Sequence, residues 1–402
     1  MRVTIQPRKG NGIVVAPPSK SMAHRYLIAA ALAKGESRIE NLSYSQDILA
    51  TLDCLESLGV EPERGVDWVV IRGGGTLVPQ KNLACRESGS TLRFFLPLCL
   101  LHEKEAILEG SARLMERPLS VYQQLCREHG FDFEQRDSFV RVRGALSAGD
   151  YILPGNISSQ FITGMIFALL KVKGESRILL TGKVESGSYI DLTLDALQAF
   201  GFSLCRAGER EIRIDGNAEG EGRFIQVEGD YSNAAFFESL SLLGHSVKVK
   251  GLKEDSLQGD RIYRDYFKHL EKGQSTLSLA DCPDLGPILM AVAAAKKGGI
   301  FTDTARLKIK ESDRGAAMAE ELRKFGIEVL LEENRIIVPQ GGIHPPKEPL
   351  QAHNDHRIVM SLAVLCTLTG GVIEGAEAVA KSMPDFFERL EALGIEVKKD
   401  EA

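Results

Sequence analysis

The sequence predicts an α/β fold of six repeated units, arranged as two halves of three units with helices packed inside and sheets facing outward. Two series of segments support this prediction. One is a set of amphipathic helices that each end at a glycine, and the other is a set of apolar helices that alternates with the first. A chance spacing of glycines is the alternative, but two independent series of six agree in order along the chain.

The amphipathic helices are expected to end at Gly59, Gly130, Gly201, Gly273, Gly326 and Gly394. Glycine suits this position because it adopts the left-handed conformation without steric cost. Most intervals between these glycines are about 70 residues. The segments VVIRG, VRVRG and IRIDG follow the first three helices by 14 or 15 residues, and they predict a strand, a turn and a strand after each helix.

The second series consists of segments that are rich in alanine and apolar on nearly every side. They are residues 26–33, 93–101, 161–170, 234–243, 288–295 and 356–368. A helix that is apolar all round is buried rather than placed at the surface. Each unit is therefore expected to contain one buried helix, one amphipathic helix and several strands.

Composition excludes several classes of protein. The chain has 402 residues, a net charge of -6 and 6% aromatic residues, which argues against a nucleic-acid partner. No apolar run is long enough to span a bilayer and the N-terminus lacks a signal peptide, so we expect a cytoplasmic protein. Seven scattered cysteines without a CxxC pair predict reduced thiols, with no disulfide framework or structural zinc site.

Polar residues gather at or just before the starts of the predicted helices. Around the buried helices they form the segments SKSMAHR, ESGSTLR, GNISSQF, DCPDLGP and NDHR, and before the amphipathic helices they form MERP, KESDR and KSMPD. Helix N-termini attract anions. Capping is the alternative for the serines, and solvated surface is the alternative for each single cation. Neither alternative explains why so many cations lie at the starts of the predicted helices. This pattern favours a site that binds several phosphates or carboxylates. The cations are Lys20, Arg25, Arg117, Lys310, Arg314, Arg357 and Lys381.

Asp284 and Glu311 are carboxylates among these cations. Structural ion pairing is one reading of each, and acid–base chemistry on a polyanionic small molecule is the other. The sequence has no HExxH metal motif, no GxSxG elbow and no P-loop, so we expect neither a metal nor a cofactor.

The segments KSMAHR, SGSTLRFF, MERPL, GNISSQF, IKESDR, NDHR and KSMPDFF resemble the enolpyruvyl transferases in order and spacing, over essentially the whole chain. The resemblance is strongest to the branch that acts on shikimate 3-phosphate. It implies two domains, each a barrel of three βαβαββ units with buried helices and outward sheets, which is described as an inside-out α/β barrel. One domain would be residues 1–15 and 230–402, the other residues 16–229, and the active site would lie in the cleft between them.

The implied reaction transfers the enolpyruvyl group of phosphoenolpyruvate to the 5-hydroxyl of shikimate 3-phosphate, in the shikimate pathway to chorismate and the aromatic amino acids. The resemblance implies Asp284 as the base, Glu311 as the proton-transfer group and Lys20 as an assisting acid. It assigns to shikimate 3-phosphate Lys20, Ser21, Arg25, Ser158, Ser159, Gln160, Ser186, Asp284 and Lys310. It assigns to phosphoenolpyruvate Lys20, Gly89, Arg117, Gln160, Arg314, Arg357 and Lys381. Arg93, Tyr189 and His356 would complement these sets, and the protein would act as a monomer.

The chain departs from the family pattern at four positions. Ser19 stands where many members have Asp, Glu87 where most have Asn, and Ser90 and Phe94 where Thr and Pro are common. These departures bear on sensitivity to the inhibitor glyphosate more than on catalysis.

Two other functions are alternatives to this one. A transferase acting on UDP-N-acetylglucosamine usually has Asn at the position of Ser21 and a reactive Cys in the loop before the MERP segment, and this chain has neither. A non-catalytic anion-binding homologue would not need Lys20, Asp284 and Glu311 together.

Overall fold

The computed structural model describes residues 1–400, which form two compact units. Unit 1 is built from Met1–Pro17 and from the chain that begins at Gly229, and unit 2 is Pro18–Glu228. Each unit has its own core of buried apolar side chains. Among residues 1–400, no helix combines the length and the apolar character needed to cross a membrane.

Unit 2 consists of three repeats, each with the order strand, helix, strand, helix, strand, strand. The first repeat contains β14 (Phe224–Gln226), α1 (Lys20–Leu32), β3 (Gly35–Glu40), α2 (Gln46–Ser57), β4 (Glu63–Arg64) and β5 (Trp68–Gly73). The second contains β6 (Leu83–Ala84), α3 (Gly89–Cys99), β7 (Ala106–Glu109), the short α4 (Ala112–Glu116), α5 (Ser120–His129), β8 (Asp132–Gln135) and β9 (Phe139–Arg143). The third contains β10 (Asp150–Pro154), α6 (Ser159–Leu169), β11 (Glu175–Thr181), α7 (Gly187–Ala199), β12 (Leu204–Arg206) and β13 (Glu211–Asp215).

The sheets of these repeats share one topology. In the third repeat the order is β10-β11-β13-β12, with β10 parallel to β11 and the β12–β13 hairpin antiparallel to it. Buried and exposed residues alternate along β11, where Ser176, Ile178 and Leu180 are buried. This alternation is typical of a sheet with one face against a core. The mixed α/β fold with six small sheets, predicted from the repeats, is confirmed.

Unit 1 also contains three repeats, but one of them is incomplete. One complete repeat contains β16 (Thr276–Ser278), α10 (Gly286–Ala295), β17 (Gly299–Thr302), α11 (Arg314–Lys324), β18 (Leu330–Leu331) and β19 (Arg335–Val338). The other complete repeat contains β20 (Leu350–Gln351), α12 (His356–Thr369), β21 (Gly371–Glu374), α13 (Phe386–Ala392), β22 (Val397–Asp400) and β1 (Arg2–Ile5). Short 3-10 helices η2 (Pro283–Leu285), η3 (Ala305–Ile309) and η4 (Ala376–Lys381) precede α10, α11 and α13.

The incomplete repeat contains β2 (Asn11–Val15), α8 (Tyr231–Leu242), β15 (Ser246–Lys250), the 3-10 helix η1 (Gly259–Ile262) and α9 (Tyr263–Lys272). Its sheet has two parallel strands and no hairpin. The expectation of three complete βαβαββ units in each half is therefore wrong for this repeat. The missing hairpin explains why Gly326 follows Gly273 by 53 residues, whereas Gly130 follows Gly59 by 71.

The helix-ending glycines behave as expected with one exception. Gly59, Gly130, Gly201, Gly326 and Gly394 have φ values between 71° and 90°, in the left-handed region. Gly273, which ends α9, has φ 171° and lies in extended backbone. The left-handed expectation is wrong there, because the chain leaves α9 directly toward β16 instead of turning into a hairpin.

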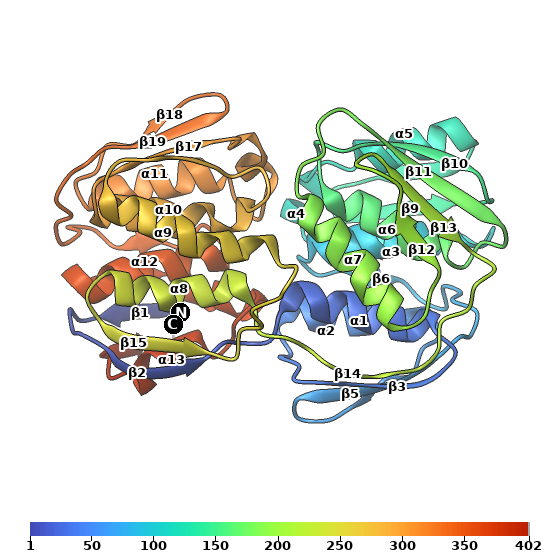
Figure 1. Ribbon diagram of the computed structural model, residues 1–402, viewed down its shortest axis with the longest axis horizontal. Helices are drawn as coiled ribbons and strands as arrows, with labels where there is room; N and C mark the ends of the chain where they lie inside the picture. The colour runs from blue at the N-terminus through green and yellow to red at the C-terminus, as the bar shows by residue number, and fades with distance from the viewer. Residues whose placement is uncertain (401–402) are drawn as a thin grey trace. The chain divides into compact units, whose positions relative to one another are not determined.

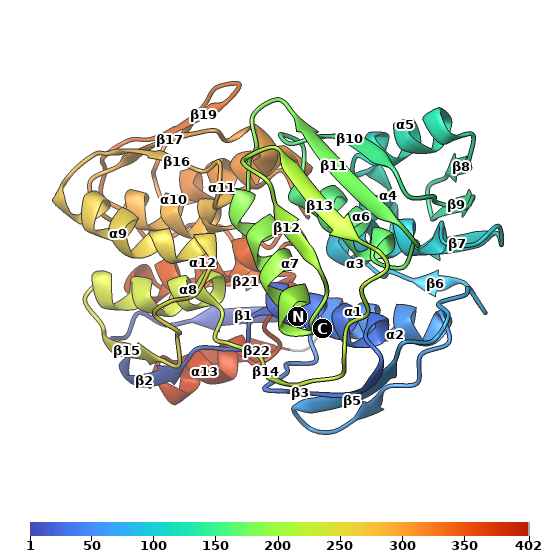
Figure 2. The ribbon, with the colours of Figure 1, turned by 45° about the vertical axis from the view of Figure 1, so that its right-hand side comes forward.

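The apolar helices lie inside each unit and the sheets lie outside. Every residue of α1 from Met22 to Leu32 is buried, and so is every residue of α10 from Gly286 to Ala294. In Figures 1 and 2, β3, β5 and β14 lie on the outer side of α1 and α2, and β17 and β19 lie on the outer side of α10. A Cβ at Gly73 would lie 2.0 Å from the carbonyl oxygen of Ala30, so the glycine lets β5 approach the end of α1.

Candidate active site

In unit 2, the three internal helices each begin with a serine cap. The side chains of Ser19, Ser88 and Ser158 accept hydrogen bonds from the backbone N–H groups of Met22, Thr91 and Gln160, at 3.4, 3.2 and 3.3 Å. Each cap occupies one of the N–H groups that a helix leaves unpaired at its start. Capping is thus part of the reason for these serines, and other first-turn groups of the same helices stay available for an anion.

Lys20 is the first residue of α1 and forms an ion pair with Asp47. Its Nζ lies 2.7 Å from Oδ2 of Asp47, which is in the first turn of α2. Both side chains are largely buried. The pair links the starts of two helices in one repeat and holds a cation at the level of the serine caps.

Arg25 lies one turn further along α1 and is buried. It donates hydrogen bonds to the carbonyl oxygen of Ser21 at 2.7 Å, to that of Tyr189 at 3.0 Å and to Oγ1 of Thr193 at 2.9 Å. Its guanidinium also lies 5.9 Å from the centre of the Tyr189 ring. Burial lowers the pKa of Arg25 to about 10, which leaves it charged at neutral pH. Arg25 therefore connects α1 to α7.

Gln160, in the first turn of α6, connects that helix to α3. Its Nε2 donates to Oγ of Ser90 at 2.9 Å, and its Oε1 accepts from Nη1 of Arg93 at 2.7 Å. Arg93 also donates to the carbonyl oxygen of Pro118 at 3.2 Å. Ser159, next to Gln160, is buried. Residues from three separate motifs are thus joined at one end of the helix bundle.

Gly89 and Arg117 lie in direct contact. A Cβ at Gly89 would lie 2.5 Å from Nη1 and 2.7 Å from Cζ of Arg117. Arg117 follows α4 and is buried. The glycine therefore lets the guanidinium lie against the first turn of α3, where the backbone N–H groups also favour an anion.

Ser186 precedes α7 and has φ 54°, which is uncommon for a residue with a side chain. Its Oγ is buried, and within residues 1–400 it has no hydrogen-bond partner. A buried hydroxyl without a hydrogen-bond partner lowers the stability of the fold. The position of Ser186 is consistent with a ligand that would hydrogen-bond to this hydroxyl.

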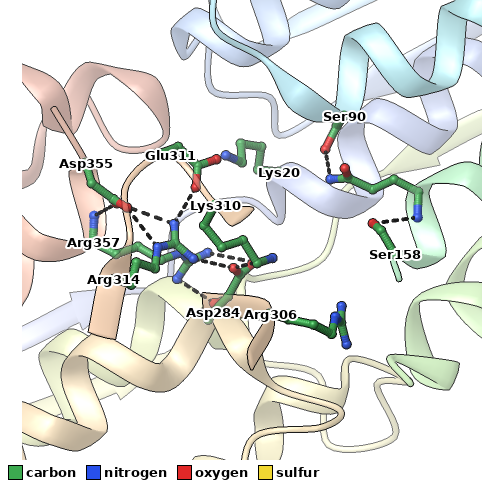
Figure 3. Close-up of polar contacts among 12 residues, drawn as sticks. Lys20, Ser90, Ser158, Asp284, Arg306, Lys310, Glu311, Arg314, Asp355 and Arg357 are labelled. Carbon is green, nitrogen blue, oxygen red and sulfur yellow. Dashed lines mark hydrogen bonds and ion pairs between the residues drawn. The ribbon is translucent and has the colours of Figure 1, made fainter. Parts of the chain in front are cut away.

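In unit 1, Arg314 is the centre of an ion-pair network. It is the first residue of α11 and is 1% exposed. Its Nη1 lies 2.6 Å from Oδ1 of Asp284, its Nη2 2.8 Å from Oε2 of Glu311, and its Nε 2.8 Å from Oδ2 of Asp355 (Figure 3). These three carboxylates raise the pKa of Arg314, although its burial acts in the opposite direction.

Asp284 lies in η2, just before α10, and faces three cations. Besides Arg314, its Oδ1 is 3.1 Å from Nζ of Lys310 and its Oδ2 is 3.5 Å from Nη2 of Arg357. Burial would raise the pKa of Asp284, but the charges of Lys310, Arg357 and Arg314 outweigh burial and hold it well below its ordinary value. Burial also lowers the pKa of Lys310 to about 8, although Asp284 opposes this shift.

Arg357, His356 and Lys381 lie around the start of α12. Nη1 of Arg357 donates to Oγ of Ser232 at 2.7 Å. Nδ1 of the buried His356 is 3.8 Å from Oδ1 of Asp355. Nζ of Lys381, at the end of η4, donates to the carbonyl oxygen of Asn354 at 2.5 Å.

Asp355 and Asp47 were not among the residues singled out from the sequence. Asp355 is fully buried, caps α12 through the N–H of Arg357 at 2.9 Å, and accepts from Ser312 at 3.0 Å. The NDHR segment pointed to this place, but it gave no sign that Arg314 would be the partner of Asp355. Asp47 has no motif of its own and is found only through Lys20.

The predicted residues thus gather within each unit to different degrees. In unit 1, Asp284, Lys310, Glu311, Arg314 and Arg357 form one connected network. In unit 2 the predicted residues form smaller groups around Lys20, Arg25 and Gln160, a Gly89–Arg117 contact and an isolated Ser186. Ionised carboxylates beside several cations can exchange protons with a bound anion and hold it in place.

Comparisons with known proteins give one consistent result. Residues 5–390 match the family described as EPSP synthase (3-phosphoshikimate 1-carboxyvinyltransferase). A 3-phosphoshikimate 1-carboxyvinyltransferase from Clostridium kluyveri is 40% identical, over 98% of each chain, and one from Clostridium beijerinckii is 36% identical, over 97% of each chain. The structure of an EPSP synthase from Acinetobacter baumannii covers 99% of this chain and 100% of its own, with a TM-score of 0.79 at 24% identity, and supports the fold.

Proposed function

The chain belongs to the EPSP synthase (3-phosphoshikimate 1-carboxyvinyltransferase) family, and from this membership we propose which of its residues bind the substrates and which transfer protons. Its reaction moves the enolpyruvyl group of phosphoenolpyruvate to the 5-hydroxyl of shikimate 3-phosphate and releases phosphate, in the shikimate pathway. The assignment of roles rests on the geometry and charge of each cluster.

The reaction makes three demands on the protein. The oxygen of the 5-hydroxyl bonds to C2 of phosphoenolpyruvate and loses its proton, while C3 gains a proton. The tetrahedral product then loses phosphate from C2 and a proton from C3, which restores the double bond. A base is needed at the hydroxyl and an acid–base group at C3, and cations are needed to hold two anionic reactants together.

We assign the base to Asp284. Its pKa is held low by Lys310, Arg314 and Arg357, so it is ionised but weakly basic before substrates bind. When the phosphates and the carboxylates of the substrates approach these cations, their effect on Asp284 decreases and its basicity rises. The carboxylate of Asp284 is therefore more basic when both substrates are bound than when the site is empty.

We assign proton transfer at C3 to Glu311, which is oriented by its hydrogen bond to Nη2 of Arg314. Lys20 assists as an acid and as a fixed positive charge, and its ion pair with Asp47 holds it in position.

The remaining residues bind the two anions. Arg314 and Arg357 act on phosphoenolpyruvate together with Lys20, Gly89, Arg117, Gln160 and Lys381. Shikimate 3-phosphate is bound by Lys20, Ser21, Arg25, Ser158, Ser159, Gln160, Ser186, Asp284 and Lys310. Arg93, Tyr189 and His356 orient these groups, as the contacts of Arg93 with Gln160 and of Tyr189 with Arg25 suggest.

The observation that carries this proposal is the network around Arg314. Asp284 faces three cations and Arg314 faces three carboxylates, in a part of unit 1 where three motifs predicted from the sequence meet. Such a network keeps acid–base groups ionised beside positive charge, which suits anionic substrates.

Phosphate release tests the proposal. The purified protein is incubated with phosphoenolpyruvate and either shikimate 3-phosphate or UDP-N-acetylglucosamine. We expect release only with shikimate 3-phosphate, and release at least about 100-fold slower once Asp284 is replaced by alanine. Release with UDP-N-acetylglucosamine, or binding of both anions without release, would overturn the assignment of the acceptor or of the chemistry.

We further propose that the enzyme works as a monomer in the cytosol. All seven cysteines are free thiols and six of them are buried, which suits a reducing compartment. Sedimentation in the presence and absence of substrates tests the oligomeric state.

A further inference from the structure

Helix α11 contacts the segment that leads into α12 at two separate levels. At its start, Arg314 binds Asp355. Two turns later, about 10 Å along the helix axis, Glu321 and Lys324 bind residues of the segment before Asp355. The second level has no part in the proposed chemistry, which raises the question of what it does.

The second level is a buried set of charged contacts. Glu321 is fully buried, and its carboxylate accepts from the backbone N–H of Gln351 at 2.9 Å and from Nε2 of His353 at 2.9 Å. Both of its oxygens also accept from Nζ of Lys324, at 2.9 and 3.0 Å, and Lys324 donates to the carbonyl oxygen of Pro349 at 3.1 Å. Side chains of helix α11 therefore hold residues 349–353 through hydrogen bonds and ion pairs.

Residues 349–353 lead into a turn with an uncommon backbone conformation. The N–H of Asp355 donates to the carbonyl oxygen of Ala352 at 2.9 Å, and the two residues in the middle, His353 and Asn354, have φ values of 50° and 51°. A turn with positive φ at both central positions favours Asn, Asp or Gly. Asn354 fits this preference, and histidine also tolerates positive φ, so the feature that distinguishes His353 is the contact of its ring with Glu321.

This turn fixes groups that the proposed function uses. Asp355 follows it directly, caps α12 and binds Arg314. Arg357 lies two residues further, and the carbonyl oxygen of Asn354 accepts from Lys381. A shift of the turn would therefore move the partners of Arg314 and Lys381, and with them Arg357 itself, whose backbone N–H is bound by Asp355.

We propose that His353 is a positioning residue, whose hydrogen bond to Glu321 holds the left-handed turn that sets Asp355, Arg357 and Lys381 for phosphoenolpyruvate. This inference rests on the proposed function. Glu321 raises the pKa of His353, with burial acting in the opposite direction, so the charged form that donates most strongly is favoured.

A metal site is the other reading of this cluster, because ligand atoms of Glu320, Glu321 and His353 lie within 4.8 Å of one another. The ammonium group of Lys324 contacts both oxygens of Glu321, and it would repel a cation placed there. The cluster is therefore better explained as an ion-pair network that needs no metal.

Three substitutions of His353 separate the possible roles. His353→Ala removes the hydrogen bond, His353→Gln keeps an N–H donor at a similar reach, and His353→Asn keeps a residue that tolerates positive φ but shortens the reach. His344→Ala is the control, because His344 is an exposed histidine of the same unit. Kinetics with both substrates and amide hydrogen exchange of residues 350–357 without substrates are measured for each protein.

We expect His353→Ala to raise the KM for phosphoenolpyruvate about 10-fold, the lower end of the loss that follows from removing one charged hydrogen bond, with a smaller change for shikimate 3-phosphate. Exchange at residues 350–357 should become faster, His353→Gln should restore most of both properties, and His344→Ala should change neither. Rescue by Asn that is as complete as rescue by Gln, or more complete, would show that the reach to Glu321 is not needed and would overturn the proposal, as would unchanged exchange and KM in His353→Ala. If the wild-type protein has no activity, the proposed function fails, whereas the exchange result still tests the turn.

Discussion

Replacement of Arg314 by lysine is the sharpest test of the proposed site. The change keeps the positive charge and most of the side-chain length. It removes the planar fork through which Nη1, Nη2 and Nε reach three different carboxylates at 2.6 to 2.8 Å. A single ammonium group cannot occupy all three directions, so Arg314→Lys separates geometry from charge.

The size of the effect follows from the hydrogen bonds that lysine cannot make. If lysine retains one carboxylate, two charged hydrogen bonds disappear, each with a net value of about 1.5–3 kcal/mol. The sum is about 3–6 kcal/mol, and each 1.4 kcal/mol corresponds to a factor of ten. Even if half of this free energy falls on stability rather than on catalysis, we expect kcat/KM to fall by at least about 10-fold.

The assay is phosphate release at varied phosphoenolpyruvate, with thermal unfolding measured in parallel. Arg335→Lys is the matched control, because Arg335 is an exposed arginine of the same unit, with its Nη1 3.5 Å from Glu332, and such surface pairs contribute little. A folded Arg314→Lys protein with kcat/KM within about threefold of the wild-type value would refute the reasoning, since a difference of that size is less than one charged hydrogen bond.

Three further predictions concern single residues. Asp284→Ala should lower kcat by about 100-fold or more with the fold intact, and near-normal turnover would remove Asp284 from its role as base. Because the pKa of Lys310 is about 8, kcat/KM should fall as the pH rises through that value and Lys310 loses its charge. If kcat/KM of the Lys310→Arg protein falls over the same alkaline pH range, the fall belongs to another titrating group. Gly89→Ala should displace Arg117, whose Nη1 would lie 2.5 Å from the new Cβ, and should raise the KM for phosphoenolpyruvate; an unchanged KM would place Arg117 outside the phosphoenolpyruvate site.

Much of the fold follows from local sequence features. The apolar segments became α1, α3, α6, α8, α10 and α12, because a helix that is apolar all round has no stable place at the surface. The segment VVIRG lies in β5, and VRVRG and IRIDG lie in β9 and β13 except for their last glycines, which follow the strands directly. These features depend on the properties of neighbouring residues and on glycine at helix ends, which a sequence displays directly.

Pairing between distant segments was harder to predict. Nothing in Phe224–Gln226 indicates that it completes the sheet of the first repeat, beside β3. The partnership of Asp355 with Arg314 spans 41 positions in the chain and depends on how α11 packs on α12. The sequence contained both charges, but only packing decides which of several nearby carboxylates an arginine meets.

The positions of β1 and β14 bear on the order in which the chain folds. Unit 2 is continuous from Pro18 to Glu228, so all of its strands, including β14, have been synthesised before most of unit 1 exists. In unit 1, β1 lies between β21 and β22, so β1 is synthesised early but can pair only after β21 and β22 have been synthesised. Such long-range pairing is slow. Unit 2 is therefore expected to fold during synthesis, whereas unit 1 completes its sheet only after the last strand leaves the ribosome.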